Sequence, residues 1–184
     1  MKEGLSDRKK TIIAFFILAL MGCIIGWIYE MLFYRIDMGY FIRRGQGFGP
    51  WLPIYGFGAL GLTAFTYKKH LPAWLVFIIA VVGSFIIEFG TGYVLYHYFD
   101  GLRLWDYNTE IWNFGNIGGY VCLRSVLVFG VLGLLYSLWA IPGFFTLSDK
   151  WSKKMILAVS VPTAILFFSD ILFSYILLPV LARG

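Results

Sequence analysis

The chain has 184 residues, of which 60% are hydrophobic, 20% are aromatic and only 14% are charged, and its mean hydropathy is +0.78. A water-soluble domain would carry about 25% charged residues, so this composition excludes an ordinary soluble fold and indicates an all-α integral membrane protein. The net charge of +5 does not indicate a nucleic-acid partner, because the basic residues flank apolar segments as membrane topology requires.

Five apolar segments predict five transmembrane helices, since about 20 helical residues cross a hydrocarbon core of about 30 Å. Within a single transmembrane domain, 1–184, they cover approximately 11–34, 51–67, 72–98, 121–142 and 155–181. The second segment is short, and Pro53 and several glycines interrupt its pattern. We therefore expect it to be irregular or kinked on its outer side.

The basic residues predict the orientation of the chain. Nine of them lie at the N-terminus and in two short connections: Lys2, Arg8, Lys9, Lys10, Lys68, Lys69, Lys150, Lys153 and Lys154. Six lie on the other side, where acidic residues offset them: Arg35, Arg43, Arg44, Arg103, Arg124 and Arg183. The positive-inside rule therefore predicts that the N-terminus is inside and the C-terminus outside.

The two outer loops, 35–50 and 99–120, are rich in Trp, Tyr, Arg, Gly and Asn, whereas the inner connections are short. An interfacial belt would explain the aromatic residues but not the Asn and Gly residues. We expect both loops to be structured, with 99–120 forming a fixed lid over a polar site. The candidate ligand contacts in these loops and at the adjoining helix end are Trp105, Asp106, Tyr107, Asn113, Asn116 and Tyr55.

The first two hairpins resemble each other. In each, a carboxylate (Glu30 or Glu88) precedes an arginine-bearing loop and a Gly-rich, aromatic string, 47–56 or 113–120. Both would run from inside to outside and back, so they predict a parallel tandem repeat about an axis along the membrane normal. The alternative is that any two apolar hairpins with interfacial glycines look similar.

Four ionisable residues fall within or at the edge of the predicted helices: Glu30, Glu88, Arg124 and Asp170. Each would cost at least about 2.5 to 3.5 kcal/mol in lipid, so each should face protein or water. At about 1.5 Å per residue all four can share one layer in the outer half of the membrane. We expect Arg124 to pair with Glu88 or Glu30. The layer is either an outward-facing ligand site or an ion-pair network that only locks the bundle.

Gly22 and Gly26 share the helix face of Glu30, and this spacing lets helices approach closely. We therefore expect a packed face there. A bundle this thin can hardly enclose a pathway and a gate, so we expect a homodimer or a partner membrane subunit, with membrane lipid around it.

Standard enzyme constellations do not occur in the sequence. His70 and His97 do not form a pair at metal-ligand spacing, and Cys122 has no activating sequence neighbour. No Gly-rich phosphate loop is followed by Lys and Ser or Thr. We expect no metal and no cofactor, and the chain is not the ATPase of a pump. Two alternatives to a transporter remain: an enzyme that uses carboxylates on a lipid or lipid-linked substrate, and a non-catalytic scaffold or regulatory subunit.

Several strings carry a family resemblance: Gly26-Trp27 with Glu30, Gly47-Phe48-Gly49-Pro50, Pro53-Ile54-Tyr55-Gly56, Glu88, Leu104-Trp105-Asp106-Tyr107, and Asn116 with Cys122-Leu123-Arg124-Ser125. Over approximately residues 12–142 the chain resembles the bacterial family described as putative ABC-transporter type IV, or CmpB-like. The resemblance implies transport and a multi-pass protein of the bacterial plasma membrane. Gly118-Gly119-Tyr120 departs from the apolar entry expected there, and Asp170 lies outside the resembling part.

Overall fold

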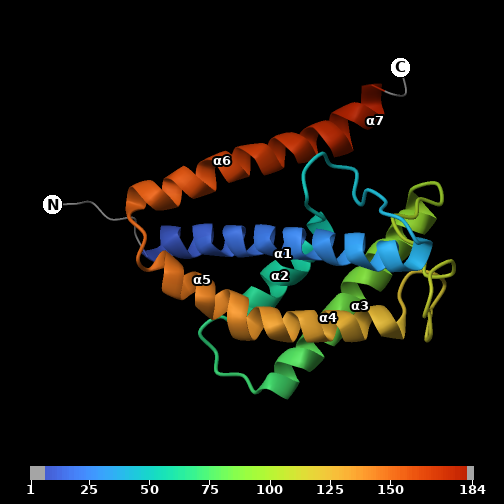
Figure 1. Cartoon of the computed structure of the whole chain (residues 1–184), viewed down its shortest axis with the longest axis horizontal. Helices are drawn as coiled ribbons and strands as arrows, with labels where there is room; N and C mark the ends of the chain where they lie inside the picture. The colour runs from blue at the N-terminus through green and yellow to red at the C-terminus, as the bar shows by residue number, and fades with distance from the viewer. Residues whose placement is uncertain (1–6, 182–184) are drawn as a thin grey trace. The chain divides into compact units, whose positions relative to one another are not determined.

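The computed structural model describes residues 7–181, and within them the chain forms five continuous helices (Figure 1). Three are regular: α1 (Asp7–Met38), α2 (Pro53–Thr66) and α3 (Ala73–Tyr98). The fourth comprises α4 (Leu123–Leu135), the π-helical turn η1 (Tyr136–Ala140) and α5 (Ile141–Ser148). The fifth comprises α6 (Lys153–Ile171), the π-helical turn η2 (Leu172–Leu177) and α7 (Leu178–Leu181). The described part contains no strand, only an isolated bridge between Ile117 and Val121. Lys2 and Arg183 lie outside it.

Four helices are long and apolar enough to cross a membrane: Arg8–Met38, Ala73–Tyr98, Leu123–Ser148 and Lys153–Leu181. The prediction of five transmembrane helices is wrong for the second segment. Helix α2 has only 14 residues, about 21 Å at 1.5 Å per residue. It begins at Pro53, a residue that suits the first helical position because it has no N–H to satisfy. Residues 51 and 52 of the predicted segment are not helical, whereas Pro53–Thr66 is an unbroken helix, so the expected kink does not occur within it.

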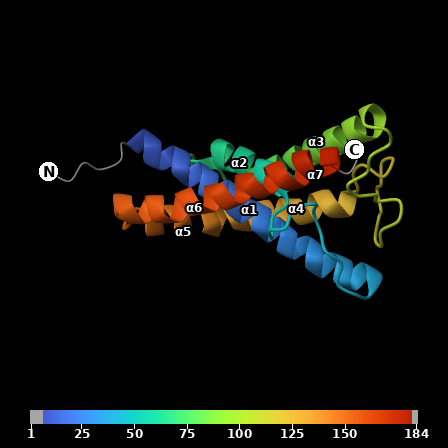
Figure 2. The same cartoon turned by 90° about the horizontal axis from the view of Figure 1, so that it is seen from above.

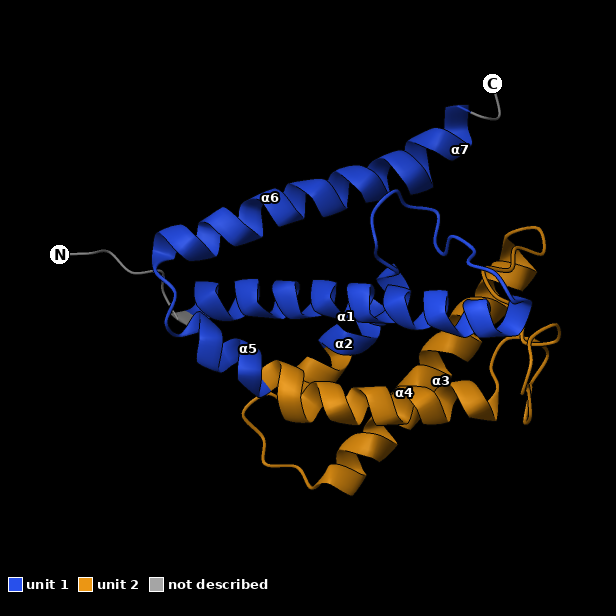
Figure 3. Cartoon of the chain, in the orientation of Figure 1, with its two compact units in different colours: residues 1–60, 142–184 blue, residues 61–141 orange. Residues whose placement is uncertain are grey.

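The chain divides into two compact units (Figure 3). Unit 1 comprises Met1–Leu60 and Pro142–Gly184, and unit 2 comprises Gly61–Ile141. Each unit is described by itself below. The orientation of the chain and the tandem repeat stay predictions.

In unit 1, α1 and the first turns of α2 pack through small residues. A Cβ on Gly22 would collide with Ala59, and one on Gly26 with the ring of Tyr55. Gly56 of α2 lies in the same way against the Cys23 sulfur. The predicted packed face of α1 is therefore confirmed, and it works as small-residue faces do in membranes, by letting two backbones approach.

Residues 39–52, the return segment, run from the C-terminal end of α1 back along that helix (Figures 1 and 2). Their last N–H, that of Leu52, donates to the carbonyl oxygen of Cys23 at 3.2 Å. Cys23 lies 15 residues (38 − 23) before the last residue of α1, which is about 22 Å along the helix. Non-helical backbone therefore reaches the middle of a helix that is long enough to span the bilayer, and α2 begins there.

In unit 2, α3 and α4 are antiparallel and pack through small residues. A Cβ on Gly130 would lie 2.6 Å from both Phe77 and Val81, and one on Gly133 would lie 2.6 Å from Ala80. Residues 99–122 connect the two helices and form the cap, a folded loop at the end where Glu88 and Ser125 meet. That 99–120 is a structured loop outside the membrane stays a prediction.

Candidate functional site

The ionisable residues predicted inside the helices fall into two groups. Glu30 and Asp170 belong to unit 1, whereas Glu88 and Arg124 belong to unit 2. Their placement in one shared layer stays a prediction, and each group has its own geometry within its unit.

Glu30, on α1, forms an ion pair with the return segment. Arg44 Nε donates to Glu30 Oε2 at 2.6 Å, and Tyr55 Oη donates to Glu30 Oε1 at 2.9 Å. The guanidinium of Arg44 also lies 4.0 Å from the ring centroid of Tyr34, a cation–π contact. The Glu30 and Arg44 side chains keep 17% and 18% of their surface exposed, so the pair is half-buried and remains within reach of water.

Arg44 lies outside the membrane-spanning helices. Burial opposes its charge, but the nearby Glu30 carboxylate outweighs burial and raises the pKa of Arg44 above its usual value. The guanidinium is therefore a fixed positive charge beside Glu30. The sequence predicts Arg44 only as one of the outer basic residues, and the structure pairs it with Glu30, a predicted site carboxylate.

Asp170, on α6, binds the return segment with both carboxylate oxygens. Oδ1 accepts from the Phe48 N–H at 2.8 Å and from Ser174 Oγ at 2.8 Å. Oδ2 accepts from the Gly49 N–H at 2.8 Å and from Trp51 Nε1 at 2.7 Å. Four hydrogen-bond donors on one carboxylate satisfy an ionised group.

Packing around these bonds fixes the return segment further. A Cβ at Gly47 would lie 2.7 Å from Asp170 Oδ2, so this position has room only for glycine. The carbonyl of Gly47 accepts from Arg43 Nη2 at 2.6 Å. The Trp51 ring packs edge-on against Phe167 of α6, with centroids 5.7 Å apart. The segment is therefore held to one helix by hydrogen bonds and by ring contacts.

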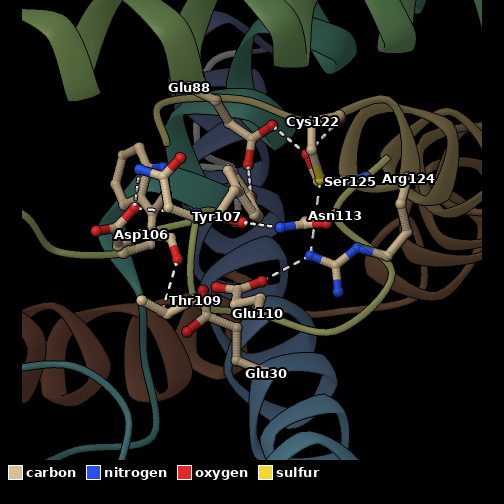
Figure 4. A network of polar contacts seen from close by, with 12 residues as sticks. Glu30, Glu88, Asp106, Tyr107, Thr109, Glu110, Asn113, Cys122, Arg124 and Ser125 are labelled. Atoms are coloured by element: carbon tan, nitrogen blue, oxygen red, sulfur yellow. Dashed lines mark hydrogen bonds and ion pairs between the residues drawn. The ribbon is translucent and has the colours of Figure 1, made fainter. Parts of the chain in front are cut away.

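Glu88, on α3, lies at the centre of the buried network of unit 2 (Figure 4). Its Oε2 accepts from Ser125 Oγ at 2.7 Å, and its Oε1 accepts from the hydroxyl of Tyr107. All three side chains are buried. Because buried polar groups are costly unless they are paired, this network ties the cap to both helices of the unit.

Tyr107 lies in the cap, outside the membrane-spanning helices. Burial raises the pKa of its phenol well above the usual value, and the Glu88 carboxylate raises it further. The hydroxyl therefore stays protonated and donates a hydrogen bond to Glu88. Tyr107 was predicted to face a ligand, but its side chain points inward to protein partners.

Arg124, at the start of α4, forms its ion pair with Glu110 of the cap, with Nη2 2.6 Å from Oε2 (Figure 4). The predicted partners were Glu88 or Glu30, so the observed ion pair corrects that prediction. Both Arg124 and Glu110 are buried. Sequence reasoning missed Glu110 because it lies in a loop among aromatic residues, where a carboxylate reads as a solvated charge. The available signal was Arg124 itself, because a buried arginine needs a carboxylate at its own end of the helix.

The cap also bonds to itself. Asp106 Oδ1 accepts from the backbone N–H and the side-chain amide of Asn108, at 3.0 and 2.7 Å, and lies 3.4 Å from Arg103 Nη1. The other predicted contacts of this loop also bond within it: Trp105 Nε1 to the Tyr120 carbonyl at 2.8 Å, Asn113 Nδ2 to the Tyr107 carbonyl at 2.9 Å, and Asn116 Nδ2 to Asn108 Oδ1 at 2.8 Å. That the cap covers a ligand stays a prediction.

Among residues 7–181, no group of three or more His, Cys, Asp or Glu side chains is placed to hold a metal ion. Four apolar helices of spanning length define a multi-pass membrane protein. The family model described as putative ABC-transporter type IV matches residues 14–175, and the chain belongs to that family. The match includes Asp170, which corrects the narrower range of 12–142 inferred from the sequence strings. No curated protein and no solved structure matches the chain.

Proposed function

We propose that the chain is a subunit of a bacterial plasma-membrane transporter, and that the polar groups of unit 1 form its outward-facing solute site. One observation carries this proposal: the return segment brings non-helical backbone to the middle of α1. Such backbone is tolerated at membrane depth only where protein buries it or where it lines a water-filled cavity. In transporters, interrupted helices of this kind form substrate sites near the bilayer midplane.

The charges of unit 1 support a solute site. Glu30 and Arg44 are paired but remain partly exposed, so a solute can compete for either partner. The network around Glu88 and Arg124 is instead buried. We assign it the structural task of holding the cap, which is the locking role that the sequence left open for these two residues.

The family description includes ABC transport, which takes its energy from ATP. The printed sequence has no Gly-rich phosphate loop, so we propose that a separate subunit supplies the ATPase. We also propose that a second copy or another membrane subunit completes the pathway, with lipid filling the remaining surface. Crosslinking in native membranes should then give species larger than the single chain, and only monomers at every crosslinker length would contradict this part.

Water access to the return segment tests the solute site. Phe48 is 65% exposed and its N–H bonds Asp170 through the backbone, so Phe48→Cys leaves that bond in place. The two natural cysteines are 2% and 1% exposed, which gives a low background of labelling. In right-side-out vesicles, membrane-impermeant thiosulfonates should modify the new thiol within minutes. Reagents of opposite charge should react at different rates, and the faster one reports the sign of charge that the site prefers.

The matched control is Leu166→Cys on α6. Leu166 is 63% exposed, but it is an apolar residue of a spanning helix, so we expect it to face lipid and to remain unmodified. Equal and slow modification of both thiols would contradict a water-filled site at Phe48 and would favour a scaffold role. Turnover in an assay on lipid extracts that depends on Glu30 would favour the enzyme alternative.

A further inference from the structure

We infer that the return segment contains an anion-binding nest that Asp170 occupies in place of a ligand, and that the ligand is a solute or lipid carrying a carboxylate or phosphate group. The donor nest consists of the Phe48 N–H, the Gly49 N–H and the Trp51 indole N–H. This inference rests on the proposed function, because it gives the chemical class of the solute for the same site.

The geometry of the donor nest is that of an anion receptor. Three N–H groups within four residues converge on one carboxylate, at 2.8, 2.8 and 2.7 Å. Successive backbone N–H groups aimed at one point form the concavities that bind anions in many proteins. Residue 47 must be a glycine for an anion to fit, because a Cβ there would lie only 2.7 Å from the bound Asp170 Oδ2.

The acceptor comes from far away in the chain. Phe48 and Asp170 are separated by 122 residues, and Asp170 lies one residue before the end of α6, where the π-helical turn η2 begins. Such π-helical turns occur frequently at functional sites. Only 6% of the most apolar stretch of this last helix is buried, so a shift that withdraws the carboxylate would break few contacts besides those with the return segment itself, such as the ring contact between Trp51 and Phe167.

The exchange is balanced in charge and in hydrogen bonds. One anion enters the donor nest as one carboxylate leaves it, and Ser174 Oγ, 2.8 Å from Asp170 Oδ1, leaves with the same helix. Arg43 adds positive charge beside the nest, because its guanidinium bonds the Gly47 carbonyl at 2.6 Å. A cationic solute would meet three N–H dipoles pointing at it, so the nest selects for negative charge.

Removal of the occupant tests the inference. The full chain in detergent is titrated with sodium acetate and, separately, sodium phosphate, each replacing chloride at constant ionic strength, while tryptophan emission is recorded. Asp170→Ala empties the nest and should lower the half-saturating anion concentration at least tenfold relative to the unmutated chain. Asp170→Asn, which keeps the shape and one acceptor, serves if the alanine variant does not fold, and it should lower that concentration by a smaller factor.

Two controls make the result specific. Asp149→Ala removes an exposed carboxylate elsewhere in the same unit and should leave the titration unchanged. Trp51→Phe in the Asp170→Ala background should abolish the emission change, because Trp51 is the reporter and one of the donors. Repeating the titration in phospholipid nanodiscs separates the two sources of ligand: if a headgroup fills the nest, the emission change is already complete there before any anion is added.

The inference is overturned if both Asp170 variants fold and bind neither anion more tightly than the unmutated chain, or if Asp149→Ala has the same effect. Those outcomes would leave Asp170 as a fixed structural contact. They would not touch the proposed solute site, which depends on the accessibility of Phe48→Cys and fails separately.

Discussion

The ring of Tyr55 lies directly on Gly26, so closely that a Cβ at residue 26 would overlap it. This contact holds α2 against α1 and brings the Tyr55 hydroxyl to 2.9 Å from Glu30, one turn further along α1. Because Gly26 has no side chain, Tyr55 can lie close enough to α1 to hydrogen-bond the Glu30 carboxylate.

Gly26→Ala should lower the free energy of unfolding by about 1 to 3 kcal/mol, the usual cost of overpacking a well-packed interface, and should displace Tyr55 from Glu30. Unfolding in mild detergent with increasing denaturant measures the first effect. Gly58→Ala is the matched control, because a Cβ on this α2 glycine meets nothing within 4 Å. Equal losses from both substitutions would contradict the contact.

Breaking the ion pair between Arg124 and Glu110 should destabilise the protein strongly. Either Arg124→Met or Glu110→Leu leaves one buried charge without its ion-pair partner, at a cost of about 3 to 5 kcal/mol, whereas the double variant should cost less than the sum of the two. A double-mutant cycle on thermal unfolding in detergent gives the coupling. The partly exposed pair of Arg44 and Glu30 should couple by only about 1 kcal/mol; a stronger coupling there than at Arg124 would refute this ranking.

The phenol of Tyr107 predicts a loss of stability at alkaline pH. An unperturbed tyrosine titrates near pH 10, and the pKa of folded Tyr107 is raised above that by burial and by Glu88. The stabilisation is therefore fully present below about pH 10 and is lost as pH rises through the folded pKa.

Tyr107→Phe should unfold at a lower temperature than the unmutated chain at pH 8, because Glu88 loses a donor, at about 1 to 3 kcal/mol. The difference should shrink as the pH is raised beyond 10, which parallel melting curves at several pH values will show. A difference that stayed constant up to pH 12 would mean that the hydroxyl does not titrate in this way.

Two glycines with positive φ separate backbone strain from lack of space. Gly39 has φ +80° and its Cβ would meet nothing within 4 Å, whereas Gly119 has φ +78° and its Cβ would collide with Arg103, Asn108 and Asp106. Gly39→Ala should cost only the strain of the left-handed conformation, about 1 to 2 kcal/mol. Gly119→Ala should cost more and should make the cap sensitive to limited proteolysis near Asn108. If Gly39→Ala were the more damaging substitution, the cap would not be packed as described.

Helix existence could be predicted from the sequence because long apolar runs bounded by charged residues permit few other structures in a membrane. The predicted helix 72–98 differs from α3, which spans Ala73–Tyr98, by one residue at its start. The partners of the charges were harder to predict. Glu110 and Arg44 lie in loops, where no helical periodicity predicts the direction of a side chain. Pro53 and the glycines of the second segment predicted an irregular helix but not one of only 14 residues, and the hydrogen bond between Leu52 and Cys23 is set by tertiary contact alone.

The bonds between Asp170 and the return segment have a consequence for biogenesis. The donors at Phe48, Gly49 and Trp51 are made 119 to 122 residues before their acceptor, which at about 5 to 20 residues per second is roughly 6 to 24 s of translation. Until then water or lipid headgroups must satisfy them, so the return segment cannot settle at its final depth before the last helix has been inserted. If translation stalled before residue 170, the return segment between α1 and α2 would keep these N–H groups without their carboxylate acceptor. We expect membrane quality-control proteases to recognise such an incomplete chain.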